Sequence, residues 1–299
     1  MYKINFQKPI HIHFIGIGGI SMSGLAEILL EEGFTVSGSD AKESPLTKKL
    51  ESEGAVIHYG QCAENITDDI NCVVYTAAIN KSNPELMEAV GKKIPMLTRA
   101  ELLGQLMKNY DTPIAVSGTH GKTTTTSMIS EVLLAADMDP TISVGGILKT
   151  IGGNIRVGKS GNFITEACEY TNSFLHFYPK ISVILNIEED HLDFFKDLED
   201  IRHSFHQFSA LLPSDGTLII NGDIKDYQEI YEGLDCNVIT YGSSAEFDYS
   251  ATEIQYDEKG FVSFELLKHN TSCGRVQLSV TGDHNVSNAP VSYTHLTLP

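Results

Sequence analysis

The sequence of 299 residues predicts an α/β protein with two consecutive domains, each built on a parallel β-sheet. Two observations predict this class. Short apolar runs alternate with segments of helical periodicity along most of the chain, as strands and crossover helices do in a parallel sheet. In addition, two apolar runs end in a glycine-bearing loop that leads directly into a helix, once after residue 15 and once after residue 117.

The first half of the chain shows this alternation most clearly. Predicted strands cover residues 10–19, 34–40, 55–60, 71–79 and the start of 95–109, and predicted helices cover 21–33, 44–54 and the remainder of 95–109. The first helix keeps apolar residues at helical spacing and ends at Gly33, and the second begins with a Ser cap and ends at a Gly. These signals favour right-handed crossovers on one sheet.

A domain boundary is expected where the chain turns polar around residues 108–113. We therefore assign residues 1–108 to the first domain and 109–299 to the second. In the second domain, strands are predicted over 114–118, 163–169, 181–187, 216–223 and 236–242, helices over 123–138 and 197–212, and β-hairpins over 248–279.

Composition and charge narrow the possible functions. The chain has 21 Lys and Arg against 39 Asp and Glu, a net charge of −18. This balance argues against binding to nucleic acid or to an anionic membrane surface, both of which attract basic patches. It does not exclude a small phosphate-bearing ligand, because a local loop or a bound cation can outweigh the global field.

The sequence also bears on the compartment. No apolar run reaches the ~18 residues that a membrane span needs, and the N-terminus lacks the features of a signal peptide. Five scattered cysteines, an odd number without a CxxC pair, indicate reduced thiols rather than a disulfide framework or a zinc site. We therefore expect a cytoplasmic protein; the sequence does not indicate its oligomeric state.

The strongest local motif is GTHGKTT, which follows a predicted buried strand and opens a helix. Gly118 and Gly121 let the backbone approach a phosphate chain, Lys122 can reach the β- and γ-phosphates, and the hydroxyl of Thr123 can bind Mg²⁺. The motif departs from the general phosphate-loop pattern at Val116, where that pattern has glycine. The alternative is a strand–helix turn that carries a lysine by chance.

A second glycine loop follows the first predicted strand. Gly16, Gly18 and Gly19 occupy positions of a dinucleotide-binding fingerprint, but Ser21 stands at its third glycine. Asp40 ends the second strand about 20 residues further on, where an acidic residue meets a ribose in such sites. The loop predicts a nucleotide or nucleotide-sugar diphosphate site, with a turn that binds no ligand as the alternative.

Carboxylates and a histidine follow two strands of the second domain. Glu166 and Glu169 lie at the end of one strand, and His191 lies just past another, so Glu166 and His191 are expected at the crevice that holds the GKT loop. Carboxylate oxygens suit Mg²⁺ better than imidazole does, and His191 taken alone is more typical of a capping or packing histidine. His203 and His206 are expected on the surface of an amphipathic helix.

Five segments, HFIGIGGISMSGLAE, SGTHGKTTTT, EACEYTNSFL, NIEEDHLD and TGDHNVSNA, occur in an order and spacing that closely resembles the Mur ligase family. The resemblance covers residues 10–289. It implies a Rossmann-like N-terminal domain that binds a UDP-sugar, followed by a P-loop-type ATPase domain. A third, C-terminal Rossmann-like domain, which binds the incoming amino acid in this family, is expected to be missing.

The resemblance is greatest to members that join L-alanine to the lactyl carboxylate of UDP-N-acetylmuramate in peptidoglycan precursor synthesis. It implies that ATP and Mg²⁺ activate this carboxylate as an acyl phosphate, which the amine of alanine attacks. The implied catalytic residues are Lys122, Glu166 and His191, with Thr123, Glu166 and His191 at the metal ions. The implied ATP-binding residues are Gly118, Thr119, His120, Gly121, Lys122, Thr123, Thr124, His284, Asn285 and Asn288, and the implied UDP-sugar residues are Gly16, Gly18, Gly19, Ser21, Asp40, Thr76 and Arg99.

The last residues differ from the family pattern. Pro290 is expected to stop or kink the helix that begins near His284, and residues 290–299 are expected to be a non-native tail on a truncated gene, because VSYTHL resembles translated adapter DNA. A fragment of this kind is expected to be inactive as it stands.

Three other functions stay open. A muropeptide ligase or another member of the family would use the same ATP site with a different acceptor. A nicotinamide-dependent dehydrogenase could use the first glycine loop but would not need the GKT loop. A non-catalytic UDP-sugar-binding protein would not need Lys122, Glu166 and His191 together.

Overall fold

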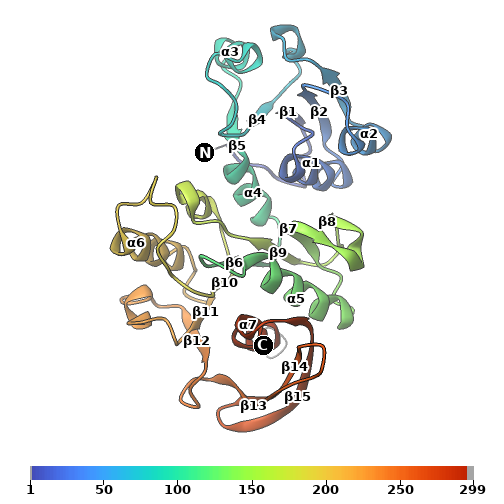
Figure 1. The fold of residues 1–299 in the computed structure, drawn as a ribbon. Coiled ribbons are helices and arrows are strands. Elements are labelled where there is room, and N and C mark those ends of the chain that lie inside the picture. Colours follow the sequence, from blue (N-terminus) through green and yellow to red (C-terminus); the bar gives the residue numbers. More distant parts are fainter. Residues whose placement is uncertain (1, 295–299) are drawn as a thin grey trace. The chain divides into compact units, whose positions relative to one another are not determined.

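The structure is a computed structural model that describes residues 2–294, apart from the side chains of residues 283, 284, 287, 293 and 294. Contacts divide the chain into two compact units, residues 1–109 and 110–299. The boundary placed on composition stands one residue earlier. Each unit is α/β, as the alternation of apolar runs and helical segments predicts (Figure 1).

The first unit carries a parallel sheet in the order β3-β2-β1-β4-β5 over the described residues. Its elements are β1 (His11–Ile15), α1 (Ile20–Glu31), β2 (Thr35–Asp40), α2 (Pro45–Ser52), β3 (Val56–Tyr59), the 3₁₀ turn η1 (Ala63–Asn65), β4 (Cys72–Tyr75), α3 (Pro84–Gly91), β5 (Met96–Thr98) and α4 (Arg99–Met107). This order is that of a Rossmann-like half, which confirms the predicted class. The order reverses between β1 and β4, so the loop after β1 lies at the switch point.

Local signals at the helix ends explain where the helices begin and end. Ser44 caps α2 through a capping box with Thr47, and Pro45 starts the helix. Gly33, with φ +79°, ends α1, and the next amide, of Phe34, donates to the carbonyl of Leu29 at 2.9 Å. The cap and the glycine stop predicted from the sequence are therefore confirmed. Helix α3 lay in a stretch for which no element was predicted.

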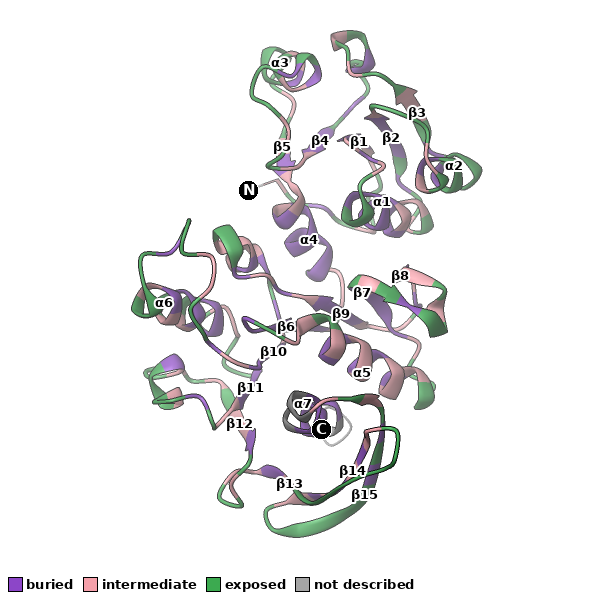
Figure 2. Ribbon diagram, in the orientation of Figure 1, coloured by how far each residue is buried: buried purple, intermediate pink, exposed green. Residues whose placement is uncertain are grey.

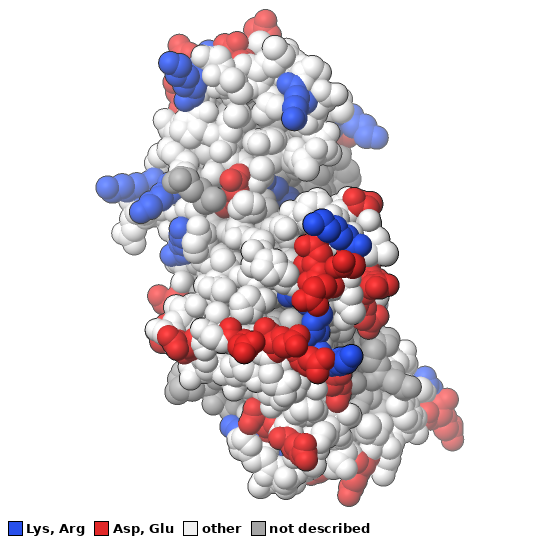
Figure 3. Space-filling view, turned by 90° about the vertical axis from the view of Figure 1, so that its left-hand side faces the viewer, with Lys and Arg blue, Asp and Glu red and all other residues white. Residues whose placement is uncertain are grey.

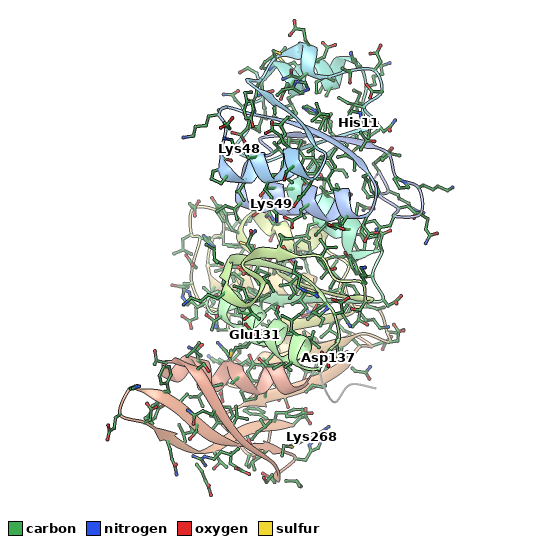
Figure 4. All side chains as sticks on the ribbon, turned by 90° about the vertical axis from the view of Figure 1, so that its right-hand side faces the viewer. His11, Lys48, Lys49, Glu131, Asp137 and Lys268 are labelled. Carbon is green, nitrogen blue, oxygen red and sulfur yellow. The ribbon has the colours of Figure 1, made fainter. Side chains whose placement is uncertain are left out.

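A polar cluster lies inside the core of the first unit. Glu85 is fully buried, and its carboxylate accepts hydrogen bonds from Ser39 Oγ at 2.5 Å and Asn65 Nδ2 at 2.6 Å. The buried His13 places Nε2 3.8 Å from the same carboxylate. Burial raises the pKa of Glu85, but its interactions with His13, Ser39 and Asn65 outweigh this and lower the pKa overall. At the start of β1, His11 (labelled in Figure 4) contacts Asp69 at 2.8 Å.

The second unit carries a mixed sheet in the order β15-β14-β13-β12-β11-β10-β6-β9-β7-β8 over the described residues. Its elements are β6 (Thr112–Ser117), α5 (Lys122–Ala135), β7 (Thr141–Leu148), η2 (Lys149–Ile151), β8 (Gly153–Arg156), β9 (Asn162–Glu166), η3 (Tyr170–His176), β10 (Ile181–Ile184), α6 (Leu198–Ser209), β11 (Thr217–Asn221), η4 (Tyr227–Ile230), β12 (Asn237–Gly242), β13 (Tyr249–Tyr256), β14 (Phe261–Lys268), β15 (Thr271–Thr281) and α7 (Asp283–Thr294). Strands β13 to β15 form the predicted hairpins. Strands β7 and β8 were not predicted.

Parallel pairing positions the chemistry of this unit. Strand β6 pairs in parallel with β9 on one side and with β10 on the other, so it lies where the chain order reverses. Ligands in open α/β sheets bind outside the carboxyl ends of the strands at such a point. The central strands are largely buried (Figure 2). The loops after β6, β9 and β10 therefore leave a rigid core at one edge of the sheet.

Pro290 was expected to stop or kink its helix, and the structure contradicts the stop. Helix α7 runs through Pro290 to Thr294. Pro290 lacks the amide that would pair with Val286 one turn earlier, yet the helix packs against α5 and against β12 to β14 (Figure 1). Val286, Ala289 and Val291 are buried in the main core cluster of this unit. Burial of these side chains offsets the missing hydrogen bond.

Candidate nucleotide site

The loop between β6 and α5 has the backbone shape that a phosphate site needs. Gly121 caps α5 with φ +83°, and Gly118 has φ +142°. A Cβ on Gly118 would lie 2.9 Å from Cβ of Leu185, and one on Gly121 would lie 2.8 Å from Nδ2 of Asn288. Both positions therefore require glycine. The first-turn amides of α5, which have no partner within the helix, form the positive end of its dipole here.

The end of β10 holds this loop in place. Asn186 accepts from the amide of His120 at 2.7 Å and donates back to the His120 carbonyl at 3.0 Å. The buried Thr119 accepts from the amide of Glu188 through its hydroxyl at 2.9 Å. His120 is exposed, and its Nε2 lies 3.8 Å from Glu188. These cross-links fix the loop to the sheet rather than to its own helix alone.

Lys122 points back over the loop. Its Nζ donates to the carbonyl of Gly118 at 2.6 Å, to that of Thr119 at 3.1 Å, and to the carboxylate of Glu169 at 2.9 Å and 3.2 Å. Glu169 is 2% exposed. The ammonium is thus held at the mouth of the loop by the carboxylate that stands three residues after Glu166.

Glu166 serves the other side of the loop. Its Oε2 accepts from Thr123 Oγ1 at 3.0 Å, and its Oε1 accepts from the amide of Gly145. A Cβ on Gly145 would lie 2.9 Å from Glu166 Oε2, so this glycine on β7 leaves room for the carboxylate. A hydroxyl and a carboxylate oxygen side by side are donors that suit Mg²⁺. Among the side chains that the structure describes, no cluster of three or more His, Cys, Asp or Glu could hold a metal, so phosphate oxygens and water would have to complete the shell.

His191 lies on the far side of Glu169. Its Nε2 is 3.8 Å from Glu169 Oε1, and its backbone has φ +52°. The ring of Tyr170 packs on the imidazole with centroids 4.5 Å apart, and the Tyr170 hydroxyl donates to Asp193 at 2.9 Å, which raises the pKa of Tyr170. In the described chain, no hydrogen bond or ion pair links His191 to Glu166. The carboxylate beside Nε2 of His191 is Glu169, and Asp190 Oδ1 lies 3.9 Å from Nδ1 on the other side of the ring.

Helix α7 brings a distant segment to the same loop. Asn288 is buried, and its Nδ2 lies beside Gly121. Asn285 donates to the carbonyl of Thr281 at 2.8 Å, while its buried Oδ1 has no hydrogen-bond partner within the described residues. The side chain of His284 lies outside the described part. An open pocket of about 660 Å³ extends from Thr123 and Thr124 between α5, β15 and α7.

A second open pocket, of about 720 Å³, lies past the carboxyl ends of β10 and β11. Half of its lining residues are acidic, and the cations Arg202 and Lys225 and the amide of Asn186 also line it; the acidic residues are Glu188, Glu189, Asp197, Glu199, Asp223, Asp226 and Glu229. Figure 3 shows acidic side chains gathered over this unit. Arg202 donates to Glu229 at 2.9 Å, so the base of the pocket is partly neutralised.

The glycine loop of the first unit connects β1 to α1 and is held by Asp40. Gly16 has φ +83°, and the amide of Gly18 donates to Oδ2 of Asp40 at 2.8 Å. A turn in which the amide of Ile79 donates to the carbonyl of Thr76 lies close by, because a Cβ on Gly16 would lie 3.8 Å from Ile79 Cδ1.

The other predicted residues of this loop take up different positions. Gly19 precedes α1 as its N-cap, and Ser21 is exposed on the first turn of that helix. Arg99 begins α4 and is half-buried. Asp40 therefore holds the loop itself, a role that its position in the sequence did not reveal.

Sequence reasoning missed three contributions to the nucleotide site. Glu169 is expected only at the end of its strand, without a role, Asn186 is only the first residue of the NIEEDHLD motif, and Gly145 lies on a strand that was not predicted. The polar residues directly after buried strands were the available signal for Asn186 and Glu169. No such signal marks Gly145, since its contact with Glu166 depends on the pairing of β7 beside β9.

None of the described helices is long and apolar enough to cross a bilayer. A glycine-bearing loop at the switch point, a lysine at its mouth and a helix N-terminus behind it are together typical of the phosphate-binding α/β proteins. Comparison with known proteins then gives the family. Residues 11–111 match the model of the Mur ligase family catalytic domain, and residues 116–295 match that of the Mur ligase middle domain. The chain belongs to the Mur ligase family.

Individual relatives agree with this assignment. The UDP-N-acetylmuramate–L-alanine ligase of Agathobacter rectalis is 64% identical over 97% of this chain, and that of Lachnospira eligens is 61% identical over 97%. The chain spans 63% of the length of each of these relatives.

Two solved structures are also similar. The UDP-N-acetylmuramate:L-alanyl-γ-D-glutamyl-meso-diaminopimelate ligase of Neisseria meningitidis matches with a TM-score of 0.85 at 30% identity, over 97% of this chain and 95% of that chain. The UDP-N-acetylmuramate–alanine ligase of Thermotoga maritima matches with a TM-score of 0.80 at 28% identity, over 96% of this chain and 64% of that chain.

Proposed function

We propose that this chain carries the UDP-sugar and ATP sites of an enzyme that joins L-alanine to UDP-N-acetylmuramate, with ATP converted to ADP and phosphate. The observation that carries the proposal is the 64% identity to a ligase of that name over nearly the whole chain. The geometry of the loop before α5 supports the ATP-dependent part. The reaction belongs to peptidoglycan precursor synthesis.

The residues around α5 divide the work on the phosphate chain. The helix N-terminus and Lys122 bind and orient the phosphates, because amides and an ammonium at this point face any anion in the loop. Thr123 and Glu166 would hold Mg²⁺, which neutralises charge on the phosphoryl group when bound. His191, on the far side of Glu169, is the third proposed catalytic residue beside Lys122 and Glu166. We assign the adenine to the part of α7 that carries Asn285 and Asn288, and His284, whose side chain lies outside the described part, to the same role.

The first unit would bind the UDP-sugar. We assign the diphosphate to the amides of the loop at Gly16, Gly18 and Gly19, with Ser21 on the first turn of α1 and Thr76 and Arg99 at its edge. Asp40 supports this loop through Gly18. We place the reaction in the cytoplasm, since the five cysteines, all within the described range, form no disulfide.

A second candidate, a muropeptide ligase, has one observation in its favour. The Neisseria meningitidis ligase matches with a TM-score of 0.85, above the 0.80 of the Thermotoga maritima ligase. Two sequence comparisons outweigh this, because relatives at 64% and 61% identity bear the name of the L-alanine ligase. Both candidates share the nucleotide and UDP-sugar sites and differ in the acceptor.

Calorimetry on the chain of 299 residues tests the two binding sites separately. We expect Mg-ADP and UDP-N-acetylmuramate each to bind one site. Lys122→Met should weaken Mg-ADP at least about tenfold while leaving the UDP-sugar unchanged. The matched control is Lys49→Met, which removes a lysine from α2 in the other unit (Figure 4). If the unaltered chain failed to bind Mg-ADP, the result would contradict the proposed ATP site. If it failed to bind UDP-N-acetylmuramate, the result would contradict the proposed UDP-sugar site.

The acceptor requires a turnover assay. Because the relatives are longer than this chain, the assay uses this chain joined to the last third of the Agathobacter rectalis relative. ATP-dependent phosphate release should require UDP-N-acetylmuramate and L-alanine. Release with the tripeptide L-alanyl-γ-D-glutamyl-meso-diaminopimelate and not with L-alanine would instead establish the muropeptide ligase.

A further inference from the structure

The contacts of Lys122 single out a residue to which no role has yet been assigned. A lysine ammonium has three donors, and these meet two loop carbonyls and the carboxylate of Glu169. The carbonyls belong to Gly118 and Thr119, within the same loop, so they cannot fix the loop relative to the rest of the sheet. Glu169 is the partner that ties the lysine to a different strand.

Glu169 has the properties of an anchor. It follows β9, which pairs with β6 next to the loop, and its side chain is 3% exposed. One of its oxygens, Oε1, lies 3.2 Å from Lys122 Nζ and 3.8 Å from His191 Nε2. A single buried carboxylate therefore lies between the lysine of the phosphate loop and the histidine of the loop after β10.

Glu166, the neighbouring carboxylate, cannot anchor Lys122 in the same way. Both oxygens of Glu166 are used by Thr123 and by the amide of Gly145, and no ion pair in the described chain joins Glu166 to Lys122. Tyr170, the residue after Glu169, packs its ring on His191 at 4.5 Å. The short segment 169–170 thus contacts the histidine on two sides while it holds the lysine.

We propose that Glu169 is a positioning residue of the nucleotide site, whose buried carboxylate holds the Lys122 ammonium and the His191 imidazole on one shared anchor. The functional meaning of this anchor rests on the nucleotide role proposed above for Lys122. Glu169 acts through its two partners: it fixes the lysine at the mouth of the loop and orients the imidazole toward it. Its removal should release both groups without unfolding the chain.

The first test measures the reactivity of Lys122 in the absence of nucleotide. The unaltered chain, Glu169→Gln and Glu229→Gln are each treated briefly with an amine-acetylating reagent, and the labelling of Lys122 is followed by mass spectrometry relative to Lys225. Lys225 is 92% exposed and serves as the internal reference. Glu229→Gln is the matched control, because it breaks the 2.9 Å pair with Arg202 outside the site.

We expect Glu169→Gln to raise the relative labelling of Lys122 at least about fivefold, because a neutral amide replaces a charge-assisted partner. Glu229→Gln should leave it within twofold. Glu169→Asp, which keeps the charge but shortens the side chain, should give an intermediate value and carries the test if the Gln variant does not fold. Unchanged labelling in folded Glu169→Gln, or in Glu169→Asp if that variant has to be used, would overturn the proposal.

The second test uses NMR spectroscopy to follow His191, the other partner of Glu169. Histidine-labelled samples give imidazole resonances, and that of His191 is assigned from its loss in His191→Gln. The His191 resonance should shift in Glu169→Gln and stay in place in Glu229→Gln. A His191 resonance that does not shift in Glu169→Gln would contradict the shared anchor. Neither test needs a ligand, so a chain that showed both effects but failed to bind Mg-ADP would refute the proposed function and leave the anchor standing.

Discussion

Gly118→Ala probes the backbone of the phosphate loop. Gly118 has φ +142°, a conformation that residues with a Cβ rarely adopt, and the cost of such a backbone is about 1–3 kcal/mol. The added Cβ would also lie 2.9 Å from Cβ of Leu185 and 3.2 Å from the amide of Asn186. Neither neighbour is the flexible end of a side chain, so overpacking adds about 1–3 kcal/mol. We expect a total loss of about 2–6 kcal/mol in the free energy of unfolding.

The matched control is Gly152→Ala. Gly152 also has a positive φ, +67°, but nothing lies within 4 Å of an added Cβ. This substitution should therefore cost only the left-handed backbone conformation, about 1–2 kcal/mol. The difference between the two variants isolates the steric contact and the more extreme backbone conformation at Gly118.

Urea unfolding followed by circular dichroism at 222 nm measures both variants, since the chain has no tryptophan for fluorescence. Mg-ADP titration adds a second readout. The carbonyl of Gly118 accepts from Lys122 at 2.6 Å, so a displaced loop should weaken binding at least about tenfold. If Gly118→Ala were no less stable than Gly152→Ala and bound Mg-ADP normally, the reasoning from loop geometry would be refuted.

Three further predictions follow from single contacts. Thr123→Val should weaken ADP about tenfold in Mg²⁺ but not in EDTA, measured by calorimetry; an equal loss in both buffers would argue against a metal role. Glu85→Gln should lower stability at pH 7 by about 1–3 kcal/mol in urea titrations. Because the pKa of Glu85 is lowered in the fold, its contribution is present above the usual value of 4.5 and is lost as the pH falls from there toward the folded pKa. The difference between Glu85→Gln and the unaltered chain should shrink below pH 4.5, and a constant difference would contradict this. Phe208→Ala should cost about 3–5 kcal/mol in the same assay, since Phe208 is fully buried and stacks on Phe174 at 4.6 Å; a loss below about 1 kcal/mol would mean that the core repacks.

Much of the fold could be predicted because its signals are local. The Ser44 cap and the glycine at position 33 act on backbone groups within a few residues, and the structure places the helix ends there. The helix through Pro290 shows the opposite case. Its local cost is real, but the burial of α7 against strands and a helix far away in the sequence outweighs it.

The sequence by itself determined most of the strands and helices, though not α3, β7 or β8, together with the two glycine loops and the residues available for phosphate chemistry, because periodicity and loop motifs are properties of neighbouring residues. Only the tertiary structure decided which carboxylate meets which partner. Glu166 and Glu169 stand three residues apart, yet one binds Thr123 and the other Lys122. This division depends on the register of β9 between β6 and β7 and on a glycine of β7, contacts that no local pattern encodes.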